Sequence, residues 1–232
     1  MACDIYIEGA ELGREVPGGY EIDGIVNIDH HAPGERMRRL VSSTNLAIEQ
    51  IKETGPAQNG TLIVVSHTDC DSVLSSAIMA GELPPEPRFG QAAISADHTG
   101  VMNELADVLQ SLEHRRDLYF SLRNLRKLLD GQPLDRTAQP AYAARLEKRE
   151  AAAAAVSNRQ VALDGNLAFG VLDAKIDGEL FPAHFPAAAV ILLISRRPRS
   201  DLWEARMRLG LTAPAGASLH QLGTERFDPA FA

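Results

Sequence analysis

Three short stretches of the chain combine aspartate with histidine, and each follows a run of mainly apolar residues. They are Asp29-His30-His31, His67-x-Asp69-x-Asp71 and Asp97-His98. Extended backbone sends every second side chain to the same face, so an alternating triad can present all of its ligands together. Carboxylate and imidazole ligands together suit Mn²⁺, Fe²⁺, Co²⁺ or Zn²⁺ better than Ca²⁺. The sequence therefore predicts a metal site that is assembled from these three stretches.

The apolar runs before the clusters predict strands. Residues 22–28 and 61–65 form two of them, and "AAISADHTG" at 92–100 predicts a third short strand that ends in Asp97 and His98. Strands that alternate with helices are typical of a parallel sheet, whose ligands bind beyond the carboxyl ends of the strands. We therefore expect the three clusters to meet at one edge of such a sheet.

Helical patterns lie between and after these runs. Ser42 or Ser43 can cap a helix that stops at Gly55, and "DSVLSSAIMAG" predicts a short helix ended by Gly81. Residues 101–129 predict two helices or one bent helix.

The rest of the chain predicts a helical connector and a second lobe. Residues 136–160 include an Ala-rich, charged helix. Beyond it, "LAFGVLDAKIDGEL" predicts a strand pair, "AAAVILLIS" a central strand and "SDLWEARMRLGL" a further strand. We predict an α/β protein with a parallel-sheet metal-binding domain at 1–135 and a smaller α+β lobe at 161–232.

Composition narrows the classes of protein that fit. The 232 residues are 45% hydrophobic and 23% charged, and no apolar run approaches the roughly 20 residues needed to span a bilayer. Two cysteines and the lack of a targeting signal predict a cytoplasmic protein with free thiols. A net charge of −8 argues against binding to duplex DNA or an anionic membrane. A small phosphorylated substrate stays compatible with this charge, because a bound metal reverses the local field.

The motifs resemble those of the DHH phosphoesterase superfamily. "NIDHHAPG" is similar to its Asp-His-His signature, "SHTDCDSVLSSA" to its His-x-Asp-x-Asp motif, and "SSTNLAIEQI" to the helix that follows Asp-His-His. Asp97 in "ISADHTG" resembles the lone aspartate of another motif, so the resemblance spans about residues 22–105. It implies a metal-dependent hydrolase that uses metal-activated water. The implied substrate is small and phosphorylated: a nucleotide, a short oligonucleotide or an inorganic phosphate anhydride.

The resemblance also implies the role of each ligand. One ion would lie on His67, Asp69 and Asp97. A second would lie on His30 and Asp71 and share Asp97. Mn²⁺ is the first expectation, and Mg²⁺, Co²⁺ and Zn²⁺ are the alternatives.

Two further sets of residues are implied to act on the substrate. His31 would face the phosphate, and Asp29 would orient the histidines. "ISRRPRS" and "GASLHQLG" resemble the basic segments of the accessory domain of these enzymes. The implied substrate-binding residues are Arg196, Arg197, Arg199 and His220.

The chain departs from the family pattern in two ways. Asp-His-His comes first instead of third, as in a circular permutation. A further metal-binding aspartate has no clear counterpart, with Asp130, Asp173 and Asp177 as unranked candidates. The alternative function is therefore a catalytically weak or inactive metal- or nucleotide-binding protein of the same fold.

Simpler interpretations exist for several of these residues. Asp71 and Asp97 can cap helices, as Asp often does. "SRRPRS" can be a solvated turn. Cys70, between two aspartates, is expected to be a buried filler rather than a nucleophile.

Overall fold

The computed structural model describes residues 1–5, 13–32, 39–197, 200–214 and 217. It is a mixed α/β structure with two compact units. The first unit comprises Met1–Asp97 and Val101–Glu147, and the second comprises His98–Gly100 and Lys148–Ala232. The boundaries at residues 135 and 160 stay predictions. None of the helices in the described ranges has the length and apolar character needed to cross a membrane.

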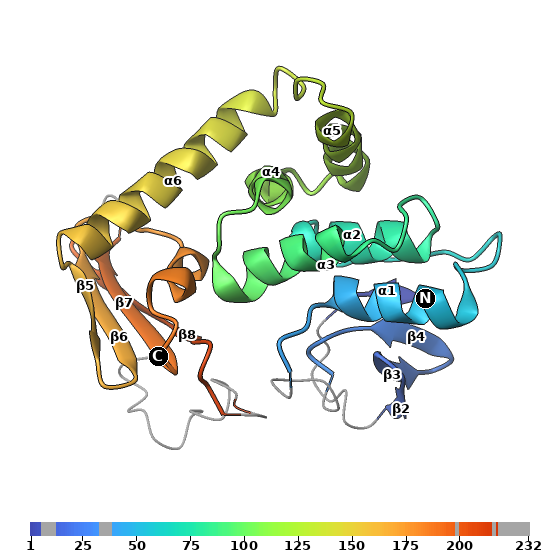
Figure 1. The fold of residues 1–232 in the computed structure, drawn as a ribbon, viewed down its shortest axis with the longest axis horizontal. Helices are drawn as coiled ribbons and strands as arrows, with labels where there is room; N and C mark the ends of the chain where they lie inside the picture. Colours follow the sequence, from blue (N-terminus) through green and yellow to red (C-terminus); the bar gives the residue numbers. More distant parts are fainter. Residues whose placement is uncertain (6–12, 33–38, 198–199, 215–216, 218–232) are drawn as a thin grey trace. The chain divides into compact units, whose positions relative to one another are not determined.

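The first unit contains a four-stranded sheet with the order β1-β4-β3-β2 (Figure 1). Its strands are β1 (Ala2–Cys3), β2 (Arg14–Val16), β3 (Gly19–Ile22) and β4 (Ile25–Ile28). Strand β1 pairs with β4 in parallel, whereas β2–β3 and β3–β4 are antiparallel. The predicted parallel sheet is therefore wrong for the described strands.

A tight hairpin explains this difference. Asp23 and Gly24 have positive φ angles of 52° and 77°, as a two-residue turn between antiparallel strands requires. Residues 22–28, predicted as one strand, therefore contain the turn as well as β4. Residues 61–65 form no regular strand, and only Val64 makes a parallel bridge, to Ala2.

The helices of the first unit lie in successive layers on one side of this sheet (Figure 1). They are α1 (Ser43–Thr54), α2 (Cys70–Met79), α3 (Pro87–Ile94), α4 (Glu104–Leu112), α5 (Leu118–Leu129) and the first part of α6 (Gln139–Ser157). Helix α1 packs on α2 and α3 and reaches the sheet at β4. Ser42 caps α1 through a capping box with Asn45, and Gly55 ends the helix, so this prediction is confirmed. The two-helix alternative for residues 101–129 is also confirmed, as α4 and α5.

The predicted third strand before Asp97 is wrong. Residues 87–94 form α3, and Ser95–Thr99 continue it as a π-helix. Pro87 begins this helix because its fixed φ and missing N–H suit the first turn. Asp97 is therefore positioned by a helical turn rather than by a strand end.

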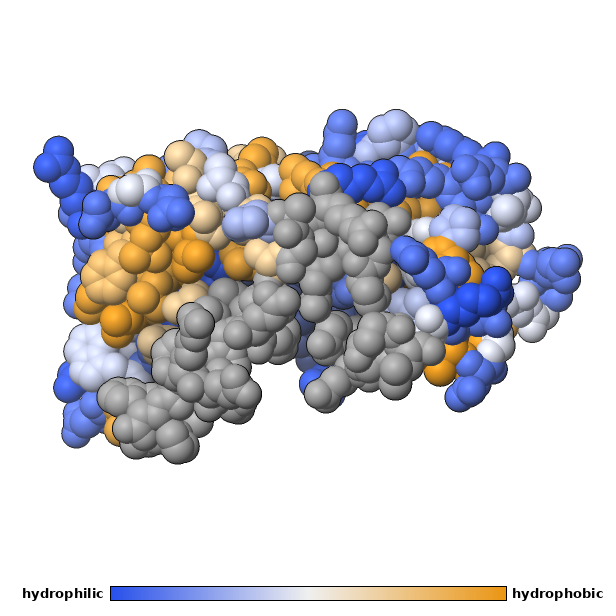
Figure 2. Space-filling model, turned by 90° about the horizontal axis from the view of Figure 1, so that it is seen from below, coloured by the Kyte–Doolittle hydropathy of each residue, from blue (hydrophilic) through white to orange (hydrophobic). Residues whose placement is uncertain are grey.

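The second unit is built on the sheet β5-β6-β7-β8. Its strands are β5 (Val161–Asp164), β6 (Leu167–Leu172), β7 (Val190–Arg196) and β8 (Trp203–Leu209). Strands β6 and β7 are parallel, and the outer pairs are antiparallel. One face carries the core of this unit, which includes Ala152 and Ala155 of α6. Alternate residues such as Phe169 and Val171 stay exposed, and Figure 2 shows apolar side chains gathered on the surface of this unit.

Candidate metal centre

Asp4, directly after β1, lies at the centre of the acid and histidine residues. Its Oδ1 is 3.6 Å from Nδ1 of His30, and its Oδ2 is 3.4 Å from Nε2 of His67. Ser43 Oγ donates to Oδ1 at 2.9 Å, and Ser72 Oγ donates to Oδ2 at 2.8 Å. The Asp4 side chain is 2% exposed. One buried carboxylate thus faces the histidines of both sequence motifs.

The backbone of Asp4 has a positive φ of 55°. Aspartate and asparagine enter this left-handed region more readily than most residues. The unusual backbone conformation turns the chain at the end of β1, where the carboxylate meets the other motifs. It also explains why a short polar residue suits this position.

His30 and His31 have different surroundings. Nδ1 of buried His30 lies 3.2 Å from Asp71 Oδ2 and 3.0 Å from Ser43 Oγ. Asp29 Oδ1 accepts the backbone N–H of His31 at 2.8 Å and lies 2.9 Å from its Nδ1. The His31 side chain is 41% exposed, so Asp29 holds in place a ring that solvent can reach.

Asp71 joins the two motifs through the start of α1. Its Oδ2 accepts the backbone N–H of Ser43 at 2.7 Å. Its Oδ1 accepts both the N–H and the Oγ1–H of Thr44, at 2.7 and 2.6 Å. The first N–H groups of a helix lack partners within the helix and carry partial positive charge, so a buried carboxylate is stabilised there.

Asp69 serves two contacts with its two oxygens. Oδ1 accepts the N–H of Ser72 and so caps α2, and Oδ2 lies 3.1 Å from Nε2 of His67. The sequence suggested helix capping by Asp71 and Asp97. Asp71 does accept the first N–H groups of a helix, α1, whereas the residue that caps α2 is Asp69. Both carboxylates also contact a histidine, so capping accounts for only part of their surroundings.

These side chains form three groups, in each of which the potential ligand atoms lie within 4.8 Å of one another. The groups are Asp4-His67-Asp69, His30-Asp71-Asp97 and Asp4-Asp29-His30-His31. The first two have no member in common, so each can take an ion without competing for a residue. Asp97 belongs with His30 and Asp71, and Asp4 holds the place with His67 and Asp69 that was expected for Asp97.

The negative charge of the cluster raises the pKa of two histidines. Burial alone would lower the pKa of His30, but its hydrogen bond to Asp71 and the charges of Asp71, Asp4 and Asp29 raise it to about 9. Hydrogen bonds to Asp4 and Asp69 raise the pKa of His67 to about 10 against the effect of burial. The pKa of Asp4 is lowered: burial opposes its ionisation, and His67, His30 and Ser72 favour it. The cluster therefore attracts positive charge, and its carboxylate and imidazole donors fit a divalent cation.

The acid that the sequence analysis missed is Asp4. Of the unranked candidates, Asp177 pairs with Lys148 at 2.8 Å, Asp173 contacts Gln160, and Asp130 ends α5. None of these three belongs to the described ligand groups. The sequence did contain a signal for Asp4. This aspartate directly follows the short apolar start "MAC", just as the other acid and histidine clusters follow apolar runs.

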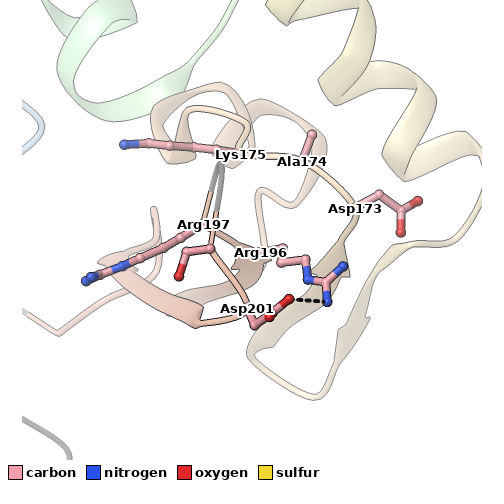
Figure 3. A pocket seen from close by; sticks show the side chains of 7 residues that line it. Asp173, Ala174, Lys175, Arg196, Arg197 and Asp201 are labelled. Atoms are coloured by element: carbon pink, nitrogen blue, oxygen red, sulfur yellow. Dashed lines mark hydrogen bonds and ion pairs between the residues drawn. The ribbon is translucent and has the colours of Figure 1, made fainter.

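The predicted substrate-binding arginines lie in the second unit. Arg196 and Arg197 line an open pocket of about 570 Å³ at the end of β7, together with Lys175 and Asp201 (Figure 3). Arg196 Nη2 is 3.1 Å from Asp201 Oδ1, whereas the side chains of Lys175 and Arg197 extend toward the other side of the view. The remaining two predicted residues, Arg199 and His220, lie outside the described residues.

Comparison of the chain with protein-family models, curated proteins and solved structures gave no match. The functional argument therefore depends on the sequence motifs and on the geometry of this site.

Proposed function

We propose that the chain is a metal-dependent phosphoesterase related to the DHH superfamily. The observation that carries this proposal is the pair of separate ligand groups, Asp4-His67-Asp69 and His30-Asp71-Asp97, linked by contacts of the buried Asp4 carboxylate. Clustered carboxylates are costly to bury without compensating positive charge. A function that uses cations explains why five aspartates and three histidines gather here.

The two groups would hold the ions, with Mn²⁺ as the first expectation because of their mixed oxygen and nitrogen donors. Two bound ions supply charge that stabilises a phosphoryl group and lowers the pKa of a water. Asp29 fixes His31 through Nδ1, so we assign the other ring nitrogen, Nε2, to a phosphoryl oxygen. Asp29 acts through His31 as a positioning residue.

The basic pocket of the second unit is proposed to bind phosphate. Arg197 and Lys175 line the same pocket, and Arg196 joins them if it exchanges Asp201 for a phosphate. Guanidinium groups bind phosphate oxygens in a forked geometry. Arg199 and His220 stay predictions for the same role. The net charge of −8 favours a nucleotide, a short oligonucleotide or an inorganic phosphate anhydride over duplex DNA.

Hydrolysis assays with defined metals test the proposal. Protein treated with chelator should lose activity toward a panel of phosphomonoesters, phosphodiesters and pyrophosphate, and Mn²⁺ should restore it. Asp97→Ala should abolish this activity. The matched control is Asp23→Asn, which removes an exposed acid in the β3–β4 turn and should keep full activity. Full activity of Asp97→Ala would refute the proposal.

One observation favours the alternative function, a metal- or nucleotide-binding protein with little or no turnover. Asp71 already accepts three hydrogen bonds from the start of α1, so its oxygens are occupied even without a metal. A carboxylate satisfied in this way binds a second ion more weakly. Metal analysis of untagged protein separates the two functions: two tightly bound ions per chain favour the enzyme, and one or none favours the binding protein.

A further inference from the structure

A side-chain hydrogen bond stabilises the helical turn that carries Asp97. Ser95–Thr99 form a π-helix, a rare geometry that is frequent at functional sites. Ser95 Oγ donates a hydrogen bond to the carbonyl oxygen of Val101, which joins the first residue of the turn to the second residue after it. Ser95 is 4% exposed, so the donor of this bond is buried.

A second hydrogen bond holds the residue that follows this turn, Gly100, which belongs to the second unit. Arg149 Nη1, on α6, donates to the carbonyl oxygen of Gly100 at 2.7 Å. Gly100 has a positive φ of 67°, and a Cβ added to it would lie 2.3 Å from the carbonyl oxygen of Glu179. The backbone at residue 100 is thus held from two sides, and only glycine fits there without displacing a neighbour.

We propose that Arg149 is a positioning residue for the metal ligand Asp97. Only two residues separate Asp97 from Gly100, so fixing the Gly100 carbonyl limits the positions that the Asp97 carboxylate can take. Asp97 belongs to the first unit and His98–Gly100 to the second. The Arg149–Gly100 hydrogen bond therefore fixes the backbone three residues after a member of the ligand group His30-Asp71-Asp97. This inference rests on the proposed metal site.

The expected effect is moderate and confined to one ion. Loss of a residue that orients a metal ligand typically lowers metal affinity about 10- to 100-fold. Arg149→Met keeps most of the aliphatic stem and removes the donor to Gly100. It should weaken the ion on His30-Asp71-Asp97 by this factor and leave the ion on Asp4-His67-Asp69 unchanged. Arg149→Lys, which can still donate to the carbonyl, should recover part of the affinity.

The test is a titration of metal-free protein with Mn²⁺, followed by electron paramagnetic resonance of the free ion. Lys148→Met is the matched control, since Lys148 precedes Arg149 on α6 but pairs with Asp177. It should bind both ions like the unmodified chain. Gly100→Ala provides a second route, because the added Cβ displaces the same backbone. Thermal unfolding of each variant confirms that it is folded, and if Arg149→Met does not fold, Arg149→Lys and Gly100→Ala decide the test.

The outcomes separate this inference from the proposed function. Weakening of one ion in Arg149→Met or Gly100→Ala, with Lys148→Met unchanged, supports the positioning role. Unmodified affinity for both ions in the folded Arg149 and Gly100 variants overturns it. If the unmodified chain binds no Mn²⁺, or Asp97→Asn leaves binding unchanged, the metal site itself is refuted.

Discussion

Replacement of Asp4 by asparagine tests the centre of the proposed site most directly. The amide has nearly the same shape as the carboxylate, and asparagine tolerates the φ of 55° at this position. The substitution removes one negative charge that lies between the rings of His30 and His67. Two effects follow, one on the stability of the metal-free protein and one on the binding of metal.

The first effect is a loss of stability in chelator. Asp4 forms a buried ion pair with His30 at 3.6 Å and accepts a hydrogen bond from Ser43 Oγ. A hydrogen bond to a charged group contributes about 1.5–3 kcal/mol, and the neutral amide keeps only part of this. The His67 side chain is 40% exposed, so solvent screening reduces its share to about 1 kcal/mol or less. A buried amide costs less desolvation than a carboxylate, which offsets part of this loss. We expect a net destabilisation of about 2 kcal/mol, which lowers the Tm by about 4–8 °C.

The second effect is loss of the stabilisation by Mn²⁺. A bound ligand at 100 times its Kd stabilises a protein by about 2.7 kcal/mol, or roughly 5–10 °C in Tm. Thermal unfolding followed by circular dichroism, with chelator and with Mn²⁺, should show this increase in the unmodified chain and not in Asp4→Asn. The control Asp23→Asn should match the unmodified chain within about 0.5 kcal/mol. An Mn²⁺-induced increase that persists in Asp4→Asn would show that Asp4 is not a ligand.

Three further results are expected. Thr44→Val removes a buried hydrogen-bond donor to Asp71 and should lower the free energy of unfolding, measured in urea, by about 2 kcal/mol. A loss under about 0.5 kcal/mol would show that the Thr44–Asp71 hydrogen bond does not stabilise the fold. The pKa of His30 is raised from 6.5 to about 9, so its stabilising contribution to metal-free protein is complete below pH 6.5 and is lost as the pH rises to about 9. Urea unfolding across that interval should show falling stability, and a rise would refute this assignment. Burial raises the pKa of Cys3 to about 12 and also raises that of Cys70, so neither thiol of the folded protein should react with a maleimide, whereas both should react in denaturant.

The helix predictions depended on capping and helix-ending residues, which have the same role in the structure. Helix α1 begins after Ser42 and ends at Gly55. The Ser42 side chain accepts a free backbone N–H at the start, and the positive φ of Gly55 lets the chain leave the helix at its end, so both signals act locally. Grouping of the acid and histidine stretches was also predictable from their positions after apolar runs. The reason given for it, a parallel sheet, was wrong.

The errors have local physical causes. "EIDGIV" contains Asp23-Gly24, a strong hairpin signal, but residues 22–28 were assigned to a single strand because four of the seven are isoleucine or valine. "AAISADHTG" resembles a strand in its apolar residues, but Pro87 and the alanines favour a helix that continues to Asp97. Asp4 was missed because β1 has only two residues, too few for any periodicity to appear.

The hydrogen bonds of Asp71 also have a consequence for proteolytic cleavage of the chain between the two motifs. They join the two motifs directly, without using the connecting segment that runs from Gly55 to His67. Asn59 and Gly60 are exposed in that segment, where an inserted protease site is best tolerated. Cleavage there would break the covalent connection between the motifs and leave their hydrogen bonds in place. The two fragments should therefore stay associated through gel filtration, and new chain ends at this turn should be compatible with the same metal centre.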